Sequence, residues 1–123
     1  MKALIRLAMT AIAVALLSWP AVAETGIASV YSDFRTACPP YRFDRNAMAV
    51  AHRTLPCGST VLILNRRNGR SIVALVSDRG PCASPQCQAT APARVRKRIL
   101  DLTPGAAHAL RAGGLTLVTV MPQ

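Results

Sequence analysis

Two neighbouring runs of β-branched and apolar residues constrain the fold of this chain more than any other feature. The runs cover residues 60–64 and 70–77, and the segment between them ends in Asn68-Gly69. Asn-Gly between two such runs is the strongest short-range signal for a β-hairpin, because the tight hairpin turns need residues that tolerate positive φ angles. The sequence therefore predicts an antiparallel strand pair across this region.

Four further segments have the composition of short strands, and one has that of a helix. The strand candidates are residues 26–31, 47–52, 99–102 and 115–121. Thr103-Pro104 is typical of an N-cap followed by the first helical residue, and Gly113-Gly114 would end the helix 104–111. Residues 80–98 contain three prolines and two cysteines and are interpreted as a long loop. Short strands without alternating helices favour a small closed β-barrel over a parallel sheet.

The first 23 residues have the features of a cleaved secretion signal. Lys2 and Arg6 precede an apolar run over 7–17, and Ala21-Val22-Ala23 has the small-x-small pattern of a signal peptidase site. The run is about eleven residues long, well short of the roughly 20 that a membrane span requires. We expect residues 1–23 to be removed, leaving a periplasmic or secreted protein with no membrane span. Because Glu24 rather than a cysteine follows the cut, no lipid anchor is expected.

Residues 24–123 are enough for one small domain with a single core. Of the 15 Lys and Arg, Lys2 and Arg6 leave with the signal, so that 13 stand against 5 Asp and Glu and the net charge is +8. A basic exported domain can bind wall carboxylates, wall phosphates or anionic lipid, and the simpler explanation is solubility. Specific nucleic-acid binding is not expected, because few aromatic residues are present for base stacking.

All four cysteines, Cys38, Cys57, Cys82 and Cys87, lie in this domain. An even number in a small exported domain predicts disulfides, with three connectivities possible. A zinc site is disfavoured because no Cys-x-x-Cys pair is present and both histidines lie far from Cys87. We expect two disulfides, no metal and no other cofactor.

Acidic residues are scarce, and Asp78 stands out among them. It ends the longest apolar strand, and Arg79-Gly80-Pro81 turn the chain directly after it. A carboxyl at such a strand end can serve as a general acid or a general base once its surroundings adjust its pKa. The alternative is a turn aspartate that forms a salt bridge with Arg79 or another arginine.

The other polar candidates have simpler interpretations. His52 ends an apolar segment and is interpreted as a hydrogen-bonded structural residue, and Asp101 as a partner of an arginine or of backbone N–H groups. Glu24 is expected to be disordered as the first residue after cleavage. His108 is assigned to the surface or to packing. The sequence contains no Ser-His-Asp pattern, phosphate-binding glycine loop or metal-ligand cluster.

Six segments in order resemble the RlpA-like (rare lipoprotein A) double-psi β-barrel family, which is related to the barrel of expansins. They are residues 26–31, 43–52, 53–58, 68–70, 78–81 and 99–102. The resemblance covers nearly all of 24–123 and implies a mainly β, six-stranded double-psi barrel with one short helix. It also implies that the loops holding Cys57 and Cys82 meet around Asp78, so we expect Cys57–Cys82 and Cys38–Cys87 pairs, with a short Cys82–Cys87 loop as the rival.

The resemblance also implies an activity. Members of this family are lytic transglycosylases that cut peptidoglycan glycan strands and leave 1,6-anhydro-muramoyl ends. An acid protonates the glycosidic oxygen, and a base takes the proton of the sugar's own 6-hydroxyl. By motif, Asp78 matches the family's catalytic aspartate and His52 its active-site histidine. We place Tyr31 and Arg79 among the glycan-binding residues.

One family position departs from the pattern. The family's glutamate, eleven residues before the histidine, is Tyr41 here. A tyrosine has a reference pKa near 10 and cannot replace a carboxylate as a base at neutral pH, but it can hydrogen-bond or stack on a sugar. We therefore expect a monomeric lytic transglycosylase acting on peptidoglycan glycan strands. The alternative is a non-catalytic, expansin-like wall-binding module, and a secreted effector or inhibitor is a third reading.

Overall fold

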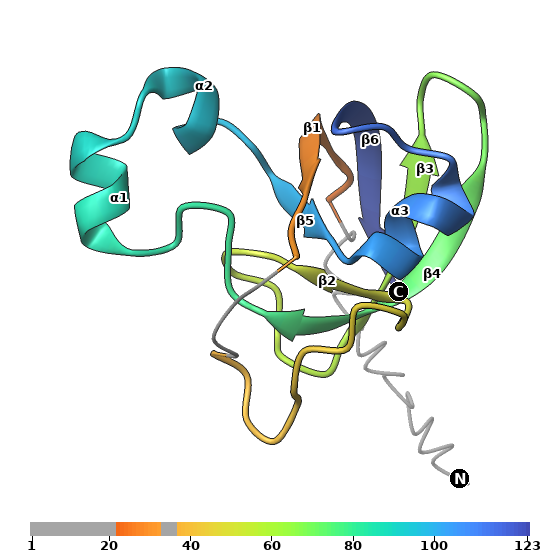
Figure 1. Ribbon diagram of the computed structural model, residues 1–123, viewed down its shortest axis with the longest axis horizontal. Helices are drawn as coiled ribbons and strands as arrows, with labels where there is room; N and C mark the ends of the chain where they lie inside the picture. Colours follow the sequence, from red (N-terminus) through yellow and green to blue (C-terminus); the bar gives the residue numbers. More distant parts are fainter. Residues whose placement is uncertain (1–21, 33–36) are drawn as a thin grey trace, which may run out of the picture.

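The computed structural model describes residues 22–32 and 37–123, so nearly all of the predicted signal peptide, residues 1–23, lies outside the described part. In the described part, six strands form a closed barrel in the order β1-β5-β2-β4-β3-β6 (Figure 1). The strands are β1 (Glu24–Val30), β2 (Ala49–Ala51), β3 (Thr60–Asn65), β4 (Ser71–Asp78), β5 (Leu100–Leu102) and β6 (Leu115–Pro122). The predicted mainly β barrel is confirmed.

The hydrophobic core fills the inside of this barrel. Alternate residues of a strand point to opposite faces, so every second residue can be buried. Val61 and Ile63 of β3 are fully buried in this way, and so are Val118 and Val120 of the neighbouring β6, where Val120 lies opposite Ile63. These residues belong to one core cluster, which also receives residues of β1, β2, β4 and β5.

The barrel is closed by two kinds of strand pairing, between neighbouring segments of the chain and between segments far apart in the sequence. The predicted hairpin is confirmed: β3 and β4 are antiparallel, with Thr60 opposite Leu75 and Leu64 opposite Ser71. In contrast, β1 pairs with β5 and β2 pairs with β4 in parallel. A parallel pair needs a long crossover connection, so these pairings join segments far apart in the sequence.

The expectation of a single helix was wrong, because the segment predicted as a long loop contains two. These are α1 (Pro85–Thr90) and α2 (Ala93–Arg96). Ser84 caps α1 by accepting a hydrogen bond from the Cys87 N–H at 3.1 Å, and Pro85 follows at the first helical position. This serine-proline start lies inside a proline-rich stretch, where the prolines suggested a loop instead.

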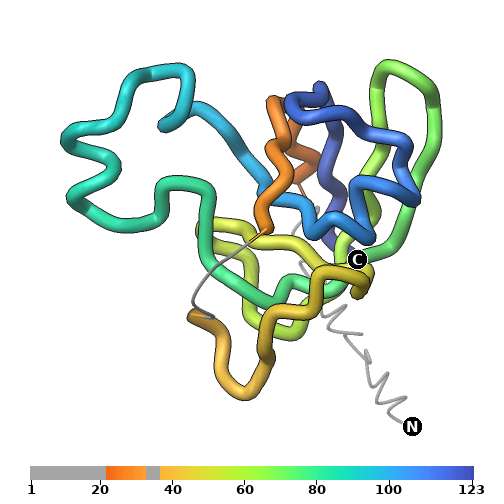
Figure 2. Tube along the Cα trace, in the orientation of Figure 1, coloured from red at the N-terminus to blue at the C-terminus, as the bar shows by residue number. Residues whose placement is uncertain are grey.

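Helices α1 and α2 form an arm, residues 82–98, that projects from the barrel (Figure 1). The tube in Figure 2 shows the arm leaving the end of β4 and returning to β5. Arg53 holds its base: Nε donates to the Pro81 carbonyl at 2.6 Å, and Nη2 donates to the Arg96 carbonyl. One guanidinium therefore connects both ends of the arm to the barrel.

The third helix, α3 (Pro104–Leu110), packs against β2, β4 and β5. Thr103 caps it as predicted: Oγ1 accepts from the Ala106 N–H at 3.1 Å and donates to the Ala47 carbonyl at 2.6 Å. The helix ends at Arg111, which adopts the left-handed conformation at φ 48°, and so stops before the expected Gly113-Gly114. None of the helices in the described residues has the length and hydropathy needed to cross a membrane.

All four cysteines form disulfides, but the expected connectivity was wrong. The pairs are Cys38–Cys57 and Cys82–Cys87, so the rival short loop is the one observed. Cys82 is the first residue of the arm, and its partner, Cys87, lies in the first turn of α1 in the same arm. Cys57 instead meets Cys38, whose segment lies over the turn after Cys57.

The two disulfides should contribute unequally to stability. They close loops with sequence separations of 19 and 5 residues, so loop entropy predicts contributions of about 3 and about 2 kcal/mol. We expect the Cys38→Ala/Cys57→Ala variant to lose more unfolding free energy in urea than Cys82→Ala/Cys87→Ala. An equal or reversed order would show that the arm disulfide supports the barrel.

A second prediction concerns the contact between α3 and the loop before β2. Gly105 donates its N–H to the Arg45 carbonyl at 2.7 Å, and a Cβ at Gly105 would lie 2.6 Å from the Asn46 carbonyl oxygen. Gly105→Ala should therefore destabilise the protein by about 1–3 kcal/mol, as overpacking does. Gly113→Ala is the matched control, because nothing lies within 4 Å of its added Cβ. Thermal melting of both variants measures the difference.

Candidate active site

Four residues form a row across four strands at one end of the barrel. Ser29 of β1 pairs with Asp101 of β5, Asp101 pairs with Ala51 of β2, and Ala51 pairs with Asp78 of β4. Their strand neighbours Ala28, Val50 and Leu100 belong to the core. Since side chains alternate along a strand, the row lies on the outer face. It places the small side chain of Ala51 between two aspartates.

An irregularity in the β2–β4 pairing places Asp78 in this row. The register shifts between Val50 and Ala51, so that Val50 opposes Val76 whereas Ala51 opposes Asp78. Ser77 is the additional residue on β4. Adjacent strands lie about 4.8 Å apart, so the backbones of Asp78 and Asp101 are about 10 Å apart with β2 between them.

Asp78, the main sequence candidate, is almost fully buried, with 2% of its surface exposed. Its Oδ1 accepts from the backbone N–H groups of Ala37 at 2.7 Å and of Arg79 at 2.8 Å. These two donors fix the orientation of the carboxyl. The segment at Ala37 therefore contacts the aspartate directly.

Arg79, expected to bind glycan, points its guanidinium at the neighbouring loop. Nη1 donates to the carbonyls of His52, at 3.1 Å, and Leu55, while Nη2 lies 3.2 Å from the Cys57 Sγ. Among the described residues, Asp78 therefore forms no ion pair with Arg79. Arg79 instead holds the turn after β2 in position beside Asp78.

Asp101, interpreted from sequence as structural, lies in the same site. The Ser29 hydroxyl donates to its Oδ1 at 2.6 Å, and its Oδ2 lies 3.1 Å from the position that a Cβ on Gly80 would occupy. Its carboxyl thus turns toward the chain that follows Asp78. Burial raises the pKa of Asp101 and the Ser29 hydrogen bond lowers it, but the net direction is upward. The charge of Asp78 also acts upward.

Tyr31 lies close to both aspartates. It directly follows β1, where its N–H donates to the Leu102 carbonyl at 3.0 Å, and its ring packs on Phe43 with centroids 5.5 Å apart. Burial raises the pKa of Tyr31, and the negative charges of Asp78 and Asp101 raise it further. Both carboxyls therefore lie close enough to act on one phenol.

The backbone N–H of His52 donates to the Asp78 carbonyl at 3.1 Å, but the described hydrogen bonds of the His52 imidazole go to other residues. The imidazole Nδ1 accepts from the N–H groups of Thr54 and Leu55, both at 3.1 Å. Nε2 lies 3.0 Å from Oε2 of Glu24, whose side chain is 44% exposed. Because Nδ1 accepts, the neutral ring carries its proton on Nε2 and donates it to Glu24.

This contact corrects the expectation for Glu24. Rather than being disordered, Glu24 is the first residue of β1, where it pairs with Val120. No sequence pattern indicated the contact, because the β1 and β2 ends come together only in the closed barrel.

Tyr41, at the family's glutamate position, lies against the turn at Gly58. Its hydroxyl lies 2.7 Å from the position of a Cβ on Gly58, and its N–H donates to the Cys38 carbonyl at 2.9 Å. The tyrosine thus covers the turn next to the Cys38–Cys57 disulfide. The structure brings together Asp78, Arg79, Tyr31 and Asp101, while Tyr41 and the His52 imidazole have separate partners.

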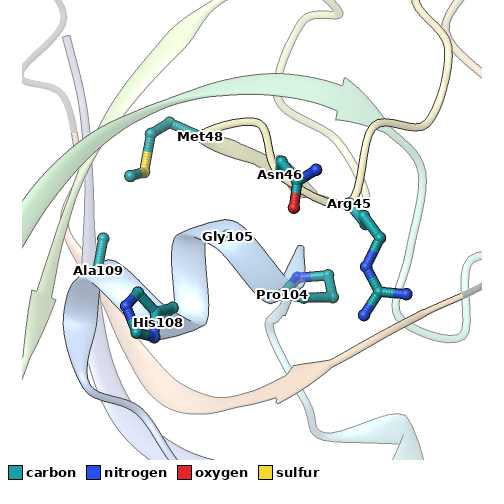
Figure 3. A pocket seen from close by; sticks show the side chains of 7 residues that line it. All are labelled: Arg45, Asn46, Met48, Pro104, Gly105, His108 and Ala109. Carbon is teal, nitrogen blue, oxygen red and sulfur yellow. The ribbon is translucent and has the colours of Figure 1, made fainter.

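A cavity of about 510 Å³ lies elsewhere, between the loop before β2 and α3 (Figure 3). It is lined by Arg45, Asn46, Met48, Pro104, Gly105, His108 and Ala109. Figure 3 shows Arg45 and Met48 on the loop side and His108 on the helix. Its lining has no carboxyl, so it offers no acid–base pair for glycoside chemistry. Within the described ranges, no group of His, Cys, Asp and Glu could hold a metal ion.

The row of side chains can therefore support proton transfer by two carboxyls in different surroundings. Burial raises the pKa of Asp101, and a carboxyl with a raised pKa can act as a general acid. A sequence signal for Asp101 existed: it stands between Leu100 and Leu102, both fully buried. An aspartate between two buried leucines of a strand must point to the opposite face.

Comparisons with known proteins place this geometry in a family. Residues 23–121 match the family described as lytic transglycolase. A protein of Synechocystis named probable endolytic peptidoglycan transglycosylase RlpA is 40% identical over 88 residues, covering 69% of this chain and 24% of that protein. The endolytic peptidoglycan transglycosylase RlpA of Yersinia pestis is 37% identical over 100 residues, covering 79% and 24%. The chain spans about a quarter of the length of these curated relatives.

A solved structure shares the fold. The Streptomyces papain inhibitor aligns with a TM-score of 0.54 at 20% identity, covering 83% of this chain and 96% of that one. At this identity the likeness concerns the fold alone, and one fold supports unrelated functions. By its family match and its relatives, the chain belongs to the RlpA-like double-psi β-barrel family of lytic transglycolases.

Proposed function

We propose that this protein is an exported lytic transglycosylase that cuts peptidoglycan glycan strands and leaves 1,6-anhydro-muramoyl ends. The observation that carries the proposal is the row that places Asp78 beside Ala51 and Asp101 on the outside of a family-matched barrel. Asp78 supplies a carboxyl that moves a proton during the reaction. His52 assists by holding the turn that follows β2, and Tyr31 and Arg79 border the glycan.

Export is part of the proposal. Cleavage after Ala23 would release residues 24–123 as a monomer into the periplasm or the medium. The two disulfides support this location, because disulfides persist in oxidising compartments and are rare in the cytosol. The wall substrate lies in the same compartment.

The charge of the arm supports an anionic substrate. Residues 82–98 contain Arg94, Arg96, Lys97 and Arg98 and no acidic residue, and the first three of these are exposed. Arginine pairs well with carboxylates, and the stem peptides of peptidoglycan carry carboxylates. Arg98, where the arm returns to β5, lies close enough to lower the pKa of Asp101, so this cation of the arm lies at one edge of the site.

A non-catalytic wall-binding module is the second candidate. The observation that favours it is the burial of Asp78, which is 2% exposed and bonded to Ala37. The tyrosine at position 41, where the family has a glutamate, points in the same direction. In this case the barrel would hold glycan without cleaving it.

The decisive test is a comparison of the wild type with Asp78→Asn on purified peptidoglycan. We expect the wild type to release anhydro-muropeptides, detected by mass spectrometry, and Asp78→Asn to lose at least about 100-fold of the rate, since a positioned acid or base contributes that much. Asp44→Asn is the matched control, because Asp44 is exposed and bonds only its own loop in the described contacts. Wild-type protein that pellets with the wall but forms no anhydro product would favour the binding module.

The role of the arm is tested separately by wall pelleting. Arg94→Gln/Arg96→Gln should weaken pelleting, because the arm loses two of its four cations. Arg66→Gln/Arg67→Gln makes the same change of net charge at the exposed β3–β4 turn and should have a smaller effect. Binding by the arm should also weaken as salt rises, since salt screens exposed charges. Equal losses in the two variants would mean that only net charge matters.

A further inference from the structure

The two aspartates of the outer row differ in what can reach them. Asp78 is 2% exposed and its Oδ1 is occupied by two backbone N–H groups. Asp101 is only partly buried, and its one described hydrogen bond comes from the Ser29 hydroxyl. Of the two carboxyls, Asp101 is therefore the more accessible from outside to an oxygen atom of a bound glycan.

The groups around Asp101 come from four separate elements. Asp78 lies at the end of β4, and Tyr31 directly follows β1. Arg53 lies in the turn after β2, and Arg98 lies where the arm enters β5. Burial raises the pKa of Asp101, the Ser29 hydrogen bond and Arg98 lower it, and the charge of Asp78 raises it again. The net upward direction means that Asp101 keeps its proton to a higher pH than an exposed aspartate does.

Gly80 explains how Asp101 reaches the turn after Asp78. A side chain there would begin 3.1 Å from the Asp101 Oδ2, and its φ of 145° is itself unfavourable for other residues. The absence of a side chain at Gly80 thus leaves space for the Asp101 carboxyl. Ala51, between the two aspartates, is 1% exposed, and a Cβ on Gly80 would lie 3.8 Å from its methyl group, so the turn after Asp78 packs over it.

We propose that Asp101 is the proton donor of this site and that Asp78 is the base, so that the two carboxyls divide the acid and base roles. This inference rests on the proposed function. The Asp101 proton passes to the glycosidic oxygen as the bond from that oxygen to the muramoyl C1 breaks. The proton of the muramoyl 6-hydroxyl passes to the Asp78 carboxylate as the O6–C1 bond forms. Solvent then returns a proton to Asp101 and removes the one on Asp78.

The assignment is tested with two substrates that differ in their need for an acid. One is a natural peptidoglycan oligosaccharide, and the other carries 4-nitrophenol at the muramoyl C1, which leaves without protonation. We expect Asp101→Asn to lose at least about 100-fold on the natural glycan but little on the aryl glycoside. Asp78→Asn should lose activity on both, because each reaction still needs a base. Wall pelleting and melting temperature show whether each variant remains folded and able to bind.

A pH profile gives an independent readout without touching either carboxyl. Since the Ser29 hydrogen bond lowers the pKa of Asp101, Ser29→Ala should raise it. Activity requires protonated Asp101, so the alkaline limb of the rate profile should move to higher pH. Thr25→Val removes a hydroxyl from the same strand that bonds Thr119 at 2.8 Å, and it should leave the limb unchanged.

The outcomes separate this inference from the proposed function. Full activity of Asp101→Asn on the natural glycan, or equal losses on both substrates, would overturn the proton-donor role while leaving the transglycosylase intact. An alkaline limb that does not move in Ser29→Ala would overturn it as well. A wild type that forms no anhydro product from either substrate would overturn the proposed function, and this inference with it.

Discussion

The short strand β2 is the element on which the rest of the structure depends. Only three residues long, it pairs in parallel with β4 and in antiparallel with β5, and so joins the two halves of the barrel. A shift in its register brings Asp78 opposite Ala51. The same alanine pairs with Asp101, so one strand lies between the two aspartates and sets the distance between their backbones. The pairing of β2 thus both closes the barrel and sets the geometry of the site.

Around this row, the charged residues fall into two groups. Arg53 and Arg79 use their guanidinium groups to hold carbonyls of the turns and of the arm, so they stabilise the loops that surround the aspartates. The exposed cations of the arm have no such role in the described contacts and face solvent. Under the proposed function, these exposed cations would attract an anionic polymer toward the protein.

Much of the barrel could be predicted from local patterns. The hairpin over β3 and β4, the Thr103-Pro104 helix start and the strand preceding Asp78 depend on neighbouring residues alone. Helix α1 was missed because prolines mark loops and helix starts alike, and only the Ser84 cap distinguishes them here. The cysteine partners could not be predicted, since pairing depends on the path of the arm, which takes Cys82 away from Cys57.

By itself, the sequence determined the β-rich class, the number of strands, the disulfide content and the identity of Asp78 as a candidate acid, because periodicity and turn residues act over a few positions. The tertiary structure alone decided that Asp101 joins Asp78, that the His52 imidazole contacts Glu24 and that Tyr41 covers Gly58. These neighbours are brought together by parallel pairing and barrel closure, which connect residues far apart in the chain and leave no local pattern.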